Sequence, residues 1–115
     1  MNNFKQNEEL SLDVLNSLKK DSKISQRLLA LKLNVSLGTI NYCLRELIKK
    51  GLVKAENFKN AKNKLAYMYV LTPKGISEKL NLTKKFLLFK QNEYIQIQKD
   101  IKKLKEELLD IEKDD

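Results

Sequence analysis

Residues 25–53 read SQRLLALKLNVSLGTINYCLRELIKKGLV, and this stretch decides the fold of the chain. The spacing of its apolar residues predicts two short helices joined by a tight turn and followed by a strand. Ser25 is a candidate N-cap for the first helix, and Ser36 is a candidate for the second. Asn34 follows the first helix, and asparagine is one of the few non-glycine residues that adopts the left-handed conformation of a sharp helix end. This order of elements is a helix-turn-helix pattern.

The second helix of this pattern has two different faces. Apolar residues recur at i, i+3, i+4, i+7 and i+8, which predicts a buried stripe. The members of the stripe are Ile40, Cys43, Leu44, Leu47 and Ile48. The opposite face carries Leu37, Gly38, Asn41, Tyr42, Arg45 and Lys49. Gly51 stands where a glycine commonly ends a helix. Gly38 has two explanations, which are close approach of the helix start to a ligand and tight packing between helices.

Composition restricts the functional classes. A chain of 115 residues with 42% hydrophobic residues fits one domain, or one small domain with an appendage. No apolar run approaches the ~18 residues of a membrane span, and the polar N-terminus does not resemble a signal peptide. With one cysteine and no histidine, the chain has no internal disulfide, no conventional zinc site and no histidine base. We therefore expect a cytoplasmic protein that is not an enzyme, needs no metal or cofactor and does not enter a membrane.

The net charge of +8 is concentrated in one part of the chain. Residues 1–20 contain three acidic and three basic side chains, and residues 76–115 contain nine of each. Residues 21–75 contain eleven Lys or Arg residues against three acidic residues, so the whole excess lies there. The helix-turn-helix falls inside this segment. Such a concentration is typical of a protein that binds a polyanion.

Further elements are predicted on both sides of the helix-turn-helix. A helix over residues 8–20 precedes it, with acidic residues near its start and lysines near its end, as the helix dipole favours. Strands over residues 52–58 and 65–71 follow it. The turn between them, residues 59–64, is rich in Asn and Lys, and it can make a tight reversal. The sequence therefore predicts a β-hairpin with a basic tip, whose lysines either contact phosphates or keep the hairpin soluble.

One long helix is predicted after the hairpin. Thr72 is a candidate N-cap, and Pro73 suits the first helical position because it has no amide hydrogen to lose. Counting from Ile76 in alternating steps of four and three residues, most positions are apolar or aromatic. These positions form one stripe along the helix, which we call the seam. The expected dimerisation residues are Ile76, Leu80, Leu87, Tyr94, Ile97, Ile101, Leu104 and Leu108. As one helix, residues 76–111 would extend about 54 Å, so the seam needs a partner unless the helix folds back on its own domain.

The order helix, helix-turn-helix, basic hairpin and long helix is that of a winged helix-turn-helix regulator. The stretches SLGTINYCL (36–44) and NFKNAKNKLAYMYVLTPKG (57–75) resemble MarR-type bacterial transcriptional regulators, most closely the subset associated with exopolysaccharide (EPS) gene clusters. The resemblance covers about residues 10–105. Leu28 and Leu31 depart from it, because related patterns usually have charged residues there, and Asn34 replaces the usual turn glycine.

We therefore predict a mainly α fold with a small β-hairpin. A winged helix-turn-helix DNA-binding domain would occupy residues 8–75, and one long C-terminal dimerisation or coiled-coil helix would occupy residues 76–112. The resemblance implies a transcriptional regulator that binds double-stranded DNA as a homodimer and controls exopolysaccharide biosynthesis genes. Classical MarR proteins also dimerise through an N-terminal helix, but little precedes the first helix here, so we expect dimerisation to rest on the C-terminal helix.

The second helix of the helix-turn-helix is expected to enter the major groove. There Asn41 would pair with adenine, Arg45 with guanine or a phosphate, and Thr39 and Tyr42 would reach base edges or backbone. The expected DNA contacts in the helix-turn-helix are Ser25, Gln26, Ser36, Leu37, Gly38, Thr39, Asn41, Tyr42, Arg45 and Lys49. Those expected in the wing are Lys59, Asn60, Lys62 and Lys64.

Two other functions fit the same pattern. In the first, the winged domain binds proteins and the long helix pairs with a different chain. In the second, Cys43 acts as a redox or ligand switch, although its place on the inward stripe between Ile40 and Leu47 favours a plain buried thiol. The sequence indicates neither an operator nor a small-molecule effector. It also leaves open repression or activation, and parallel or antiparallel pairing of the long helices.

Overall fold

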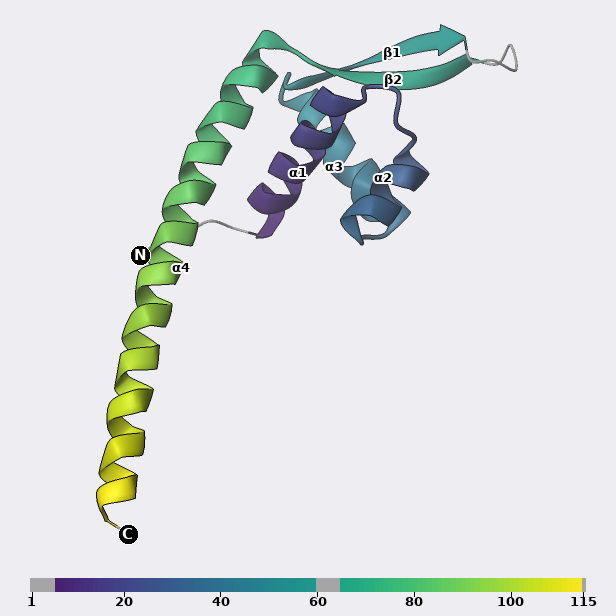
Figure 1. Ribbon diagram of the computed structural model, residues 1–115. Helices are drawn as coiled ribbons and strands as arrows, with labels where there is room; N and C mark the ends of the chain where they lie inside the picture. The colour runs from purple at the N-terminus through teal and green to yellow at the C-terminus, as the bar shows by residue number, and fades with distance from the viewer. Residues whose placement is uncertain (1–5, 60–64, 115) are drawn as a thin grey trace.

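The computed structural model describes residues 6–59 and 65–114 (Figure 1). Its elements are α1 (Gln6–Lys20), α2 (Gln26–Leu33), α3 (Leu37–Lys49), β1 (Val53–Lys59), β2 (Leu65–Leu71) and α4 (Pro73–Lys113). The first three helices and the β1–β2 hairpin form a compact unit, which we call the head, and α4 runs away from it. The predicted fold class, mainly α with one small antiparallel hairpin and a long C-terminal helix, is confirmed.

The turn between α2 and α3 is built as the sequence predicts. Ser25 caps α2 by accepting a hydrogen bond from the Leu28 amide at 3.0 Å. Asn34 ends α2 in the left-handed conformation, with φ 57°. The Val35 amide donates back to the Ala30 carbonyl at 3.1 Å, and the Asn34 amide also donates to carbonyls of the last turn, so the helix end is closed by hydrogen bonds. This closed turn fixes the direction in which α3 leaves α2.

The end of α3 repeats the same arrangement with a glycine. Gly51 has φ 77°. This backbone conformation is strained for a residue with a side chain, but glycine adopts it freely. The Gly51 amide donates to the Ile48 carbonyl, and the Leu52 amide donates to the Leu47 carbonyl, both at 2.9 Å. Leu47 and Leu52 are both buried, so the reversal after α3 is held by the core as well as by hydrogen bonds.

The core lies between α1, α2, α3 and the base of the hairpin. Its largest fully buried side chains are Leu15, Leu18, Leu29, Ile40, Leu44 and Val14. Four of the five residues in the predicted α3 stripe are buried, but Ile48 is 38% exposed, so the prediction was wrong for this residue. Eight residues of helix turn through about 80° beyond two full turns, which carries Ile48 to the edge of the stripe that begins at Ile40.

The hairpin pairs Val53 with Leu71 at its base and Lys59 with Leu65 at its far end. Strand β1 therefore starts and ends one residue later than predicted, and Lys59 belongs to the strand rather than to the turn. The predicted turn residues 60–64 lie outside the described residues. The other edge of β2 contacts the loop before α2, where the Tyr69 amide donates a hydrogen bond to the Ser22 carbonyl at 2.9 Å. The hairpin is thus tied to the helix-turn-helix through β2.

Helix α4 begins where the sequence predicts and is joined to the end of α3. Thr72 caps it by accepting a hydrogen bond from the Gly75 amide at 3.0 Å, and Pro73 occupies the first helical position. The Thr72 hydroxyl donates to the Gly51 carbonyl at 2.6 Å, and the Thr72 amide donates to the Leu52 carbonyl at 3.0 Å. A Cβ on Gly75 would overlap the Leu52 carbonyl oxygen, so this junction requires a glycine.

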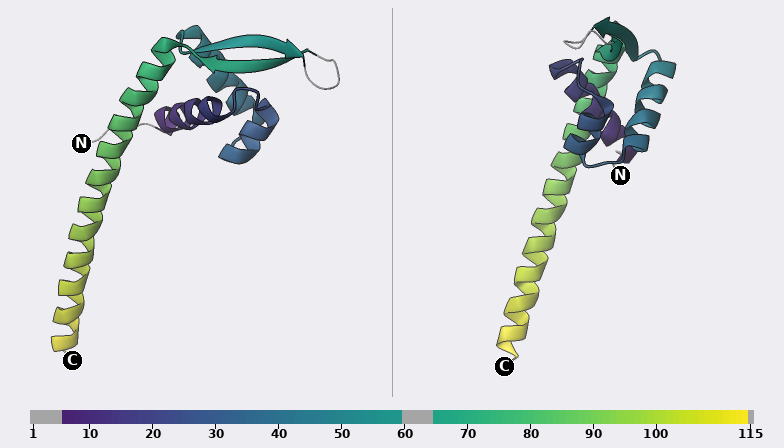
Figure 2. Two further views of the ribbon diagram at one scale, coloured as in Figure 1. Left: turned by 45° about the horizontal axis from the view of Figure 1, so that its top comes forward. Right: turned by 90° about the vertical axis from the view of Figure 1, so that its right-hand side faces the viewer.

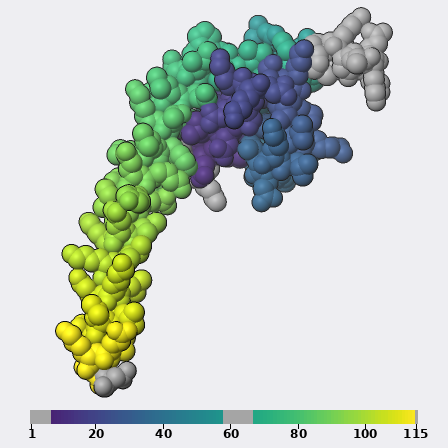
Figure 3. Space-filling model, viewed as in Figure 1, coloured from purple at the N-terminus to yellow at the C-terminus, as the bar shows by residue number. Residues whose placement is uncertain are grey.

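The first turns of α4 pack against α1. Leu82 is buried, Phe86 is half-buried against the core, and Lys85 forms an ion pair with Glu8 of α1 at 2.7 Å. From Lys90 to Asp114 every residue is exposed, and Figures 2 and 3 show this part of α4 standing clear of the head. The alternative in which the long helix folds back on its own domain is therefore wrong.

The predicted seam on α4 is exposed along its whole length. The exposed fractions of its side chains run from 47% at Ile101 to 63% at Tyr94. The seam is thus free in the single chain. Within residues 6–59 and 65–114, no helix combines the length and apolar composition needed to cross a bilayer.

Candidate nucleic-acid interface

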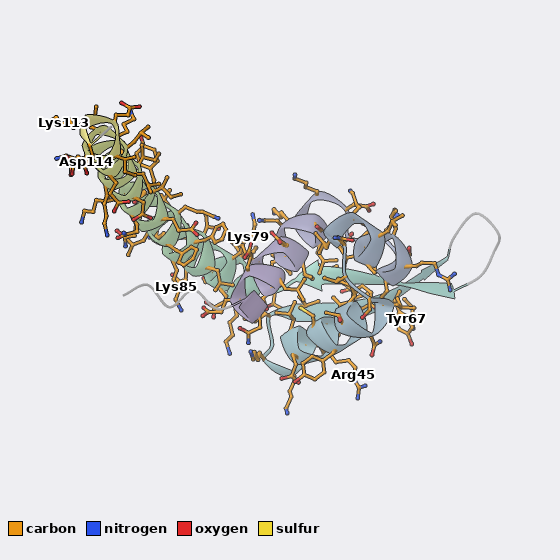
Figure 4. All side chains as sticks on the ribbon, turned by 90° about the horizontal axis from the view of Figure 1, so that it is seen from below. Arg45, Tyr67, Lys79, Lys85, Lys113 and Asp114 are labelled. Carbon is orange, nitrogen blue, oxygen red and sulfur yellow. The ribbon has the colours of Figure 1, made fainter. Side chains whose placement is uncertain are left out.

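The outward face of α3 presents the predicted contact residues together. Leu37, Gly38, Thr39, Asn41, Tyr42, Arg45 and Lys49 are all exposed. Figure 4 shows Arg45 extending away from the head. Neither Arg45 nor Lys49 forms an ion pair with any described residue, so their charges are available to an outside anion. This face has the mixture of cations, amides and hydroxyls that reads base edges and phosphates.

The start of α3 carries a closed pair of hydroxyl groups. Ser36 accepts a hydrogen bond from the Thr39 amide at 3.1 Å, and the two hydroxyl oxygens lie 2.8 Å apart in a second hydrogen bond. Both residues are exposed. The remaining amides of the first turn and the positive end of the helix dipole make this helix start a favourable place for a phosphate.

Gly38 has open space around it. A Cβ built there would meet only the Ser36 hydroxyl oxygen, at 3.9 Å, which is an ordinary contact. The explanation by tight packing between helices is therefore wrong. Close approach of the helix start to a ligand stays a prediction.

Asn41 is linked to the hairpin through Gln26. The Asn41 side-chain amide donates to the Gln26 side-chain oxygen at 3.3 Å, and the Gln26 amide nitrogen donates to the Tyr69 hydroxyl at 2.8 Å. Gln26 is the first residue of α2, and Tyr69 lies on β2. One chain of hydrogen bonds therefore connects all three parts of the expected DNA-binding surface.

The remaining predicted contacts are placed only in part. Ser25 is exposed at the start of α2, where its hydroxyl caps the helix. Lys59 ends β1, and Asn60, Lys62 and Lys64 of the expected wing tip lie outside the described residues. The structure therefore brings the helix-turn-helix contacts together and places the strand that leads to the tip.

Residues 8–54 match the family model for winged helix-turn-helix DNA-binding domains. The fold is a winged helix-turn-helix. The match covers α1, α2, α3 and the first residues of β1, and the β1–β2 hairpin is the wing. A comparison with curated protein sequences finds no match.

Solved structures of transcriptional regulators share this fold. TA0346 of Thermoplasma acidophilum, a proposed transcriptional regulator, has a TM-score of 0.64 at 19% identity, covering 74% of this chain and 86% of its own. BldR of Sulfolobus solfataricus gives 0.60 at 20% identity, covering 73% of this chain and 58% of its own. Staphylococcus aureus MarR, solved with salicylate and kanamycin, has a TM-score of 0.56 at 19% identity, covering 75% of this chain and 56% of its own.

These likenesses concern the fold. The chain spans less than two thirds of the length of BldR and of MarR. At about one residue in five identical, these structures show a shared fold and nothing finer.

Sequence reasoning missed Tyr69 as part of this surface. Its ring is 8% exposed and lies against the ring of Tyr67, with centroids 6.4 Å apart, while Tyr67 itself is 61% exposed. Alternation along β2 places both rings on one face of the wing, and this could have been read from the sequence. The hydrogen bond to Gln26 could not, because 43 residues separate the two.

A second feature of this surface is apolar. Leu28 and Leu31, where the sequence departs from related patterns, are 47% and 77% exposed on α2. Together with Leu37 they line a shallow hollow of about 510 Å³ beside the start of α3. These leucines therefore belong to the surface and contribute little to the core.

Cys43 is a core residue. Its side chain is 7% exposed, and burial raises the pKa of the thiol, an effect that a hydrogen bond with Ser11 and the charge of Lys50 only partly offset. A raised pKa keeps the thiol protonated, and a protonated thiol is a poor nucleophile.

We expect a thiol reagent to modify Cys43 at least about 100-fold more slowly in the native protein than in denaturant, because reaction requires the head to open. The measurement is the rate of colour release from a disulfide reagent at a fixed pH. Rapid modification of the native protein would contradict the assignment of Cys43 to the core and support a switch.

Proposed function

We propose that this protein is a bacterial transcriptional regulator, without enzymatic activity, that binds duplex DNA as a homodimer through its winged helix-turn-helix. The observation that carries the proposal is the exposed outer face of α3, where Arg45 and Lys49 have no ion-pair partner among the described residues. This face belongs to the segment that contains the whole net positive charge, and to a domain that matches DNA-binding domains. Such a regulator acts in the cytoplasm, where the chromosome lies.

In this proposal α3 enters the major groove. Asn41 reads adenine, Arg45 reads guanine or a phosphate, and Thr39 and Tyr42 reach base edges or backbone. The helix starts at Ser25, Gln26 and Ser36 face phosphates, where backbone amides and the helix dipole favour an anion. The wing lies along the adjacent backbone through its lysines.

Two copies are held together by α4. The exposed seam, from Ile76 to Leu108, is not covered by the head of its own chain, and a second α4 offers the same apolar surface. A symmetric dimer presents two α3 helices to two half-sites, about 34 to 36 Å apart or a multiple of that distance.

We propose exopolysaccharide biosynthesis genes as the targets. The support is the resemblance of residues 36–44 and 57–75 to regulators associated with such gene clusters. The test is to recover genomic fragments that the protein binds in the cell and to measure expression of the adjacent genes without it. Fragments that lie elsewhere would remove this assignment and leave DNA binding intact.

The decisive test of DNA binding is selection of bound duplexes from a random pool with the purified protein. An enriched two-fold symmetric sequence would support the proposal. A pool without enrichment, with no salt-dependent retention of DNA, would overturn it and favour the protein-interaction alternative.

Replacing Arg45 with alanine should weaken binding by about 1–3 kcal/mol at each half-site of the selected sequence if the guanidinium reads a base. The loss should be confined to the base pair that it contacts, so preference at that position should relax. The measurement is the equilibrium constant for the four single-base variants of the site. The control is Lys103→Ala, on the distal part of α4. An unchanged preference would remove Arg45 from base reading.

Replacing Lys59, Lys62 and Lys64 together with glutamine should reduce the salt dependence of binding. Each phosphate neutralised by a lysine contributes about 0.9 to the slope of log affinity against log salt, so loss of the six wing lysines of a homodimer should lower the slope by about 5. Preference among sequences should stay the same, because phosphate contacts carry no base information. If the slope does not change, the wing does not lie on the backbone.

A further inference from the structure

The side chain of Asn41 is hydrogen-bonded to Gln26, which is in turn hydrogen-bonded to Tyr69 of the hairpin. Gln26 accepts a hydrogen bond from the Asn41 amide at 3.3 Å and donates one to the Tyr69 hydroxyl at 2.8 Å. The three residues come from α3, α2 and β2. A hydrogen-bonded series of this kind fixes the orientation of each amide plane that it includes.

Tyr69 is the fixed end of the series. Its backbone is paired with Ala55 across the hairpin, and its amide donates to the Ser22 carbonyl at 2.9 Å. Its ring is 8% exposed and stacks on Tyr67. The Tyr69 hydroxyl is thus held in a fixed position, whereas Asn41, at the other end of the series, is exposed.

The donor and acceptor count at Asn41 fits one base. An asparagine amide has two N–H donors and one oxygen acceptor. Gln26 uses one N–H group, which leaves one donor and the oxygen for an outside partner. Adenine offers the complement in the major groove, which is the N7 acceptor and the N6 donor. Both ends of the Gln26 amide are already used within the protein, so this amide is not a free reader of bases.

We propose that Tyr69 and Gln26 are positioning residues that hold the Asn41 amide in the orientation required for adenine, without contacting the base themselves. This inference rests on the proposed DNA-binding function. According to this inference, the Tyr69 hydroxyl on β2 contributes to the sequence preference. The wing would then affect base recognition in addition to making its expected phosphate contacts.

The first experiment does not involve DNA. In Tyr69→Phe, which removes only the hydroxyl, the side-chain amide resonances of Asn41 in a nitrogen–proton NMR spectrum should shift. Tyr67→Phe is the matched control, because it removes a hydroxyl from the same strand that makes no hydrogen bond to any described residue. It should leave the Asn41 resonances in place. Unchanged Asn41 resonances in Tyr69→Phe would show that the series does not exist and would overturn the inference.

The second experiment measures base preference. The reference is the base pair of the selected site at which Asn41→Ala loses its preference. Tyr69→Phe and Gln26→Ala should each lower the ratio of affinities for adenine over the other bases by about 3- to 10-fold at that pair alone, the range expected for one hydrogen bond. Tyr67→Phe should not change this ratio. Adding Tyr69→Phe to Asn41→Ala should cause no further loss, because Tyr69 acts through Asn41.

The outcomes separate this inference from the proposed function. If the wild-type protein binds a preferred site and Tyr69→Phe keeps the full ratio, the positioning role is wrong and DNA binding stands. An equal loss of affinity for every base in Tyr69→Phe, or additive losses in the double variant, would show a general structural role and also overturn the inference. If the wild-type protein binds no DNA, both proposals fail.

Discussion

Replacing both Ile101 and Leu104 with glutamate should convert the protein to a monomer and lower its affinity for a site with two half-sites by at least about 100-fold, because bivalent attachment is lost. The two side chains are 47% and 62% exposed in the single chain and form adjacent layers of the seam. In a dimer they would face their counterparts, so each layer would bury carboxylates without partners.

The position of these residues makes the result easy to interpret. Every residue from Lys90 to Asp114 is exposed and distant from the head, so the substitutions cannot remove a contact within the winged domain. The unfolding of the head should therefore remain cooperative. Mass by sedimentation and affinity by fluorescence anisotropy measure the two effects separately.

A matched control is available on the opposite side of the helix. Lys99→Gln with Lys103→Gln changes the charge of each chain by the same two units without touching the seam. It should leave the dimer intact. A dimer that survives the glutamate substitutions, or a monomer that binds the full site as tightly as the wild-type protein, would refute the role of α4 in DNA binding.

Replacing Gly75 with alanine should lower the free energy of unfolding by about 3 kcal/mol, the upper part of the range for an overpacked site. The added Cβ would overlap the Leu52 carbonyl oxygen, and that oxygen accepts the Thr72 amide that leads into α4. Because the obstruction is backbone on both sides, no side chain can rotate away from it. The junction between α3 and α4 must open instead.

Gly38→Ala is the control, because it makes the same chemical change in a helix where a Cβ has open space. Stability should be unchanged or should rise by up to about 1 kcal/mol, since alanine favours the helix. Chemical denaturation of both variants measures the difference. Equal stability of the two variants would show that α4 does not approach Leu52 as closely as the structure has it.

Local features of the fold could be predicted from the sequence because local chemistry determines them. Ser25, Ser36 and Thr72 are caps whose partners lie three residues away, and Gly51 ends α3 for a reason that involves its own backbone alone. The periodicity of α4 was equally readable, since one repeating pattern continues through the helix. The outer face of α3 followed from the same periodicity.

Features that depend on distant contacts could not be predicted. A glycine in the first turn of a helix gives no indication that the Leu52 carbonyl lies against it. The partners of Gln26 are 15 and 43 residues away, so its role as a link was not visible. Ile48 was misplaced for a different reason, because an apolar residue eight positions along a helix has drifted off the face on which the pattern began.

Because α4 is one continuous helix, it fixes the angle, measured about its axis, between the distal part of the seam and the outer face of α3 that would meet DNA. Each residue inserted between Phe89 and Tyr94 would turn the head, together with the proximal seam residues, by about 100° about the helix axis relative to the distal seam from Tyr94 to Leu108. Seven inserted residues would restore the phase to within about 20° and move the head about 10 Å along the axis. Insertions of whole heptads would thus change the reach of the heads while nearly keeping their orientation, whereas other insertions would turn both heads away from the orientation that meets the duplex.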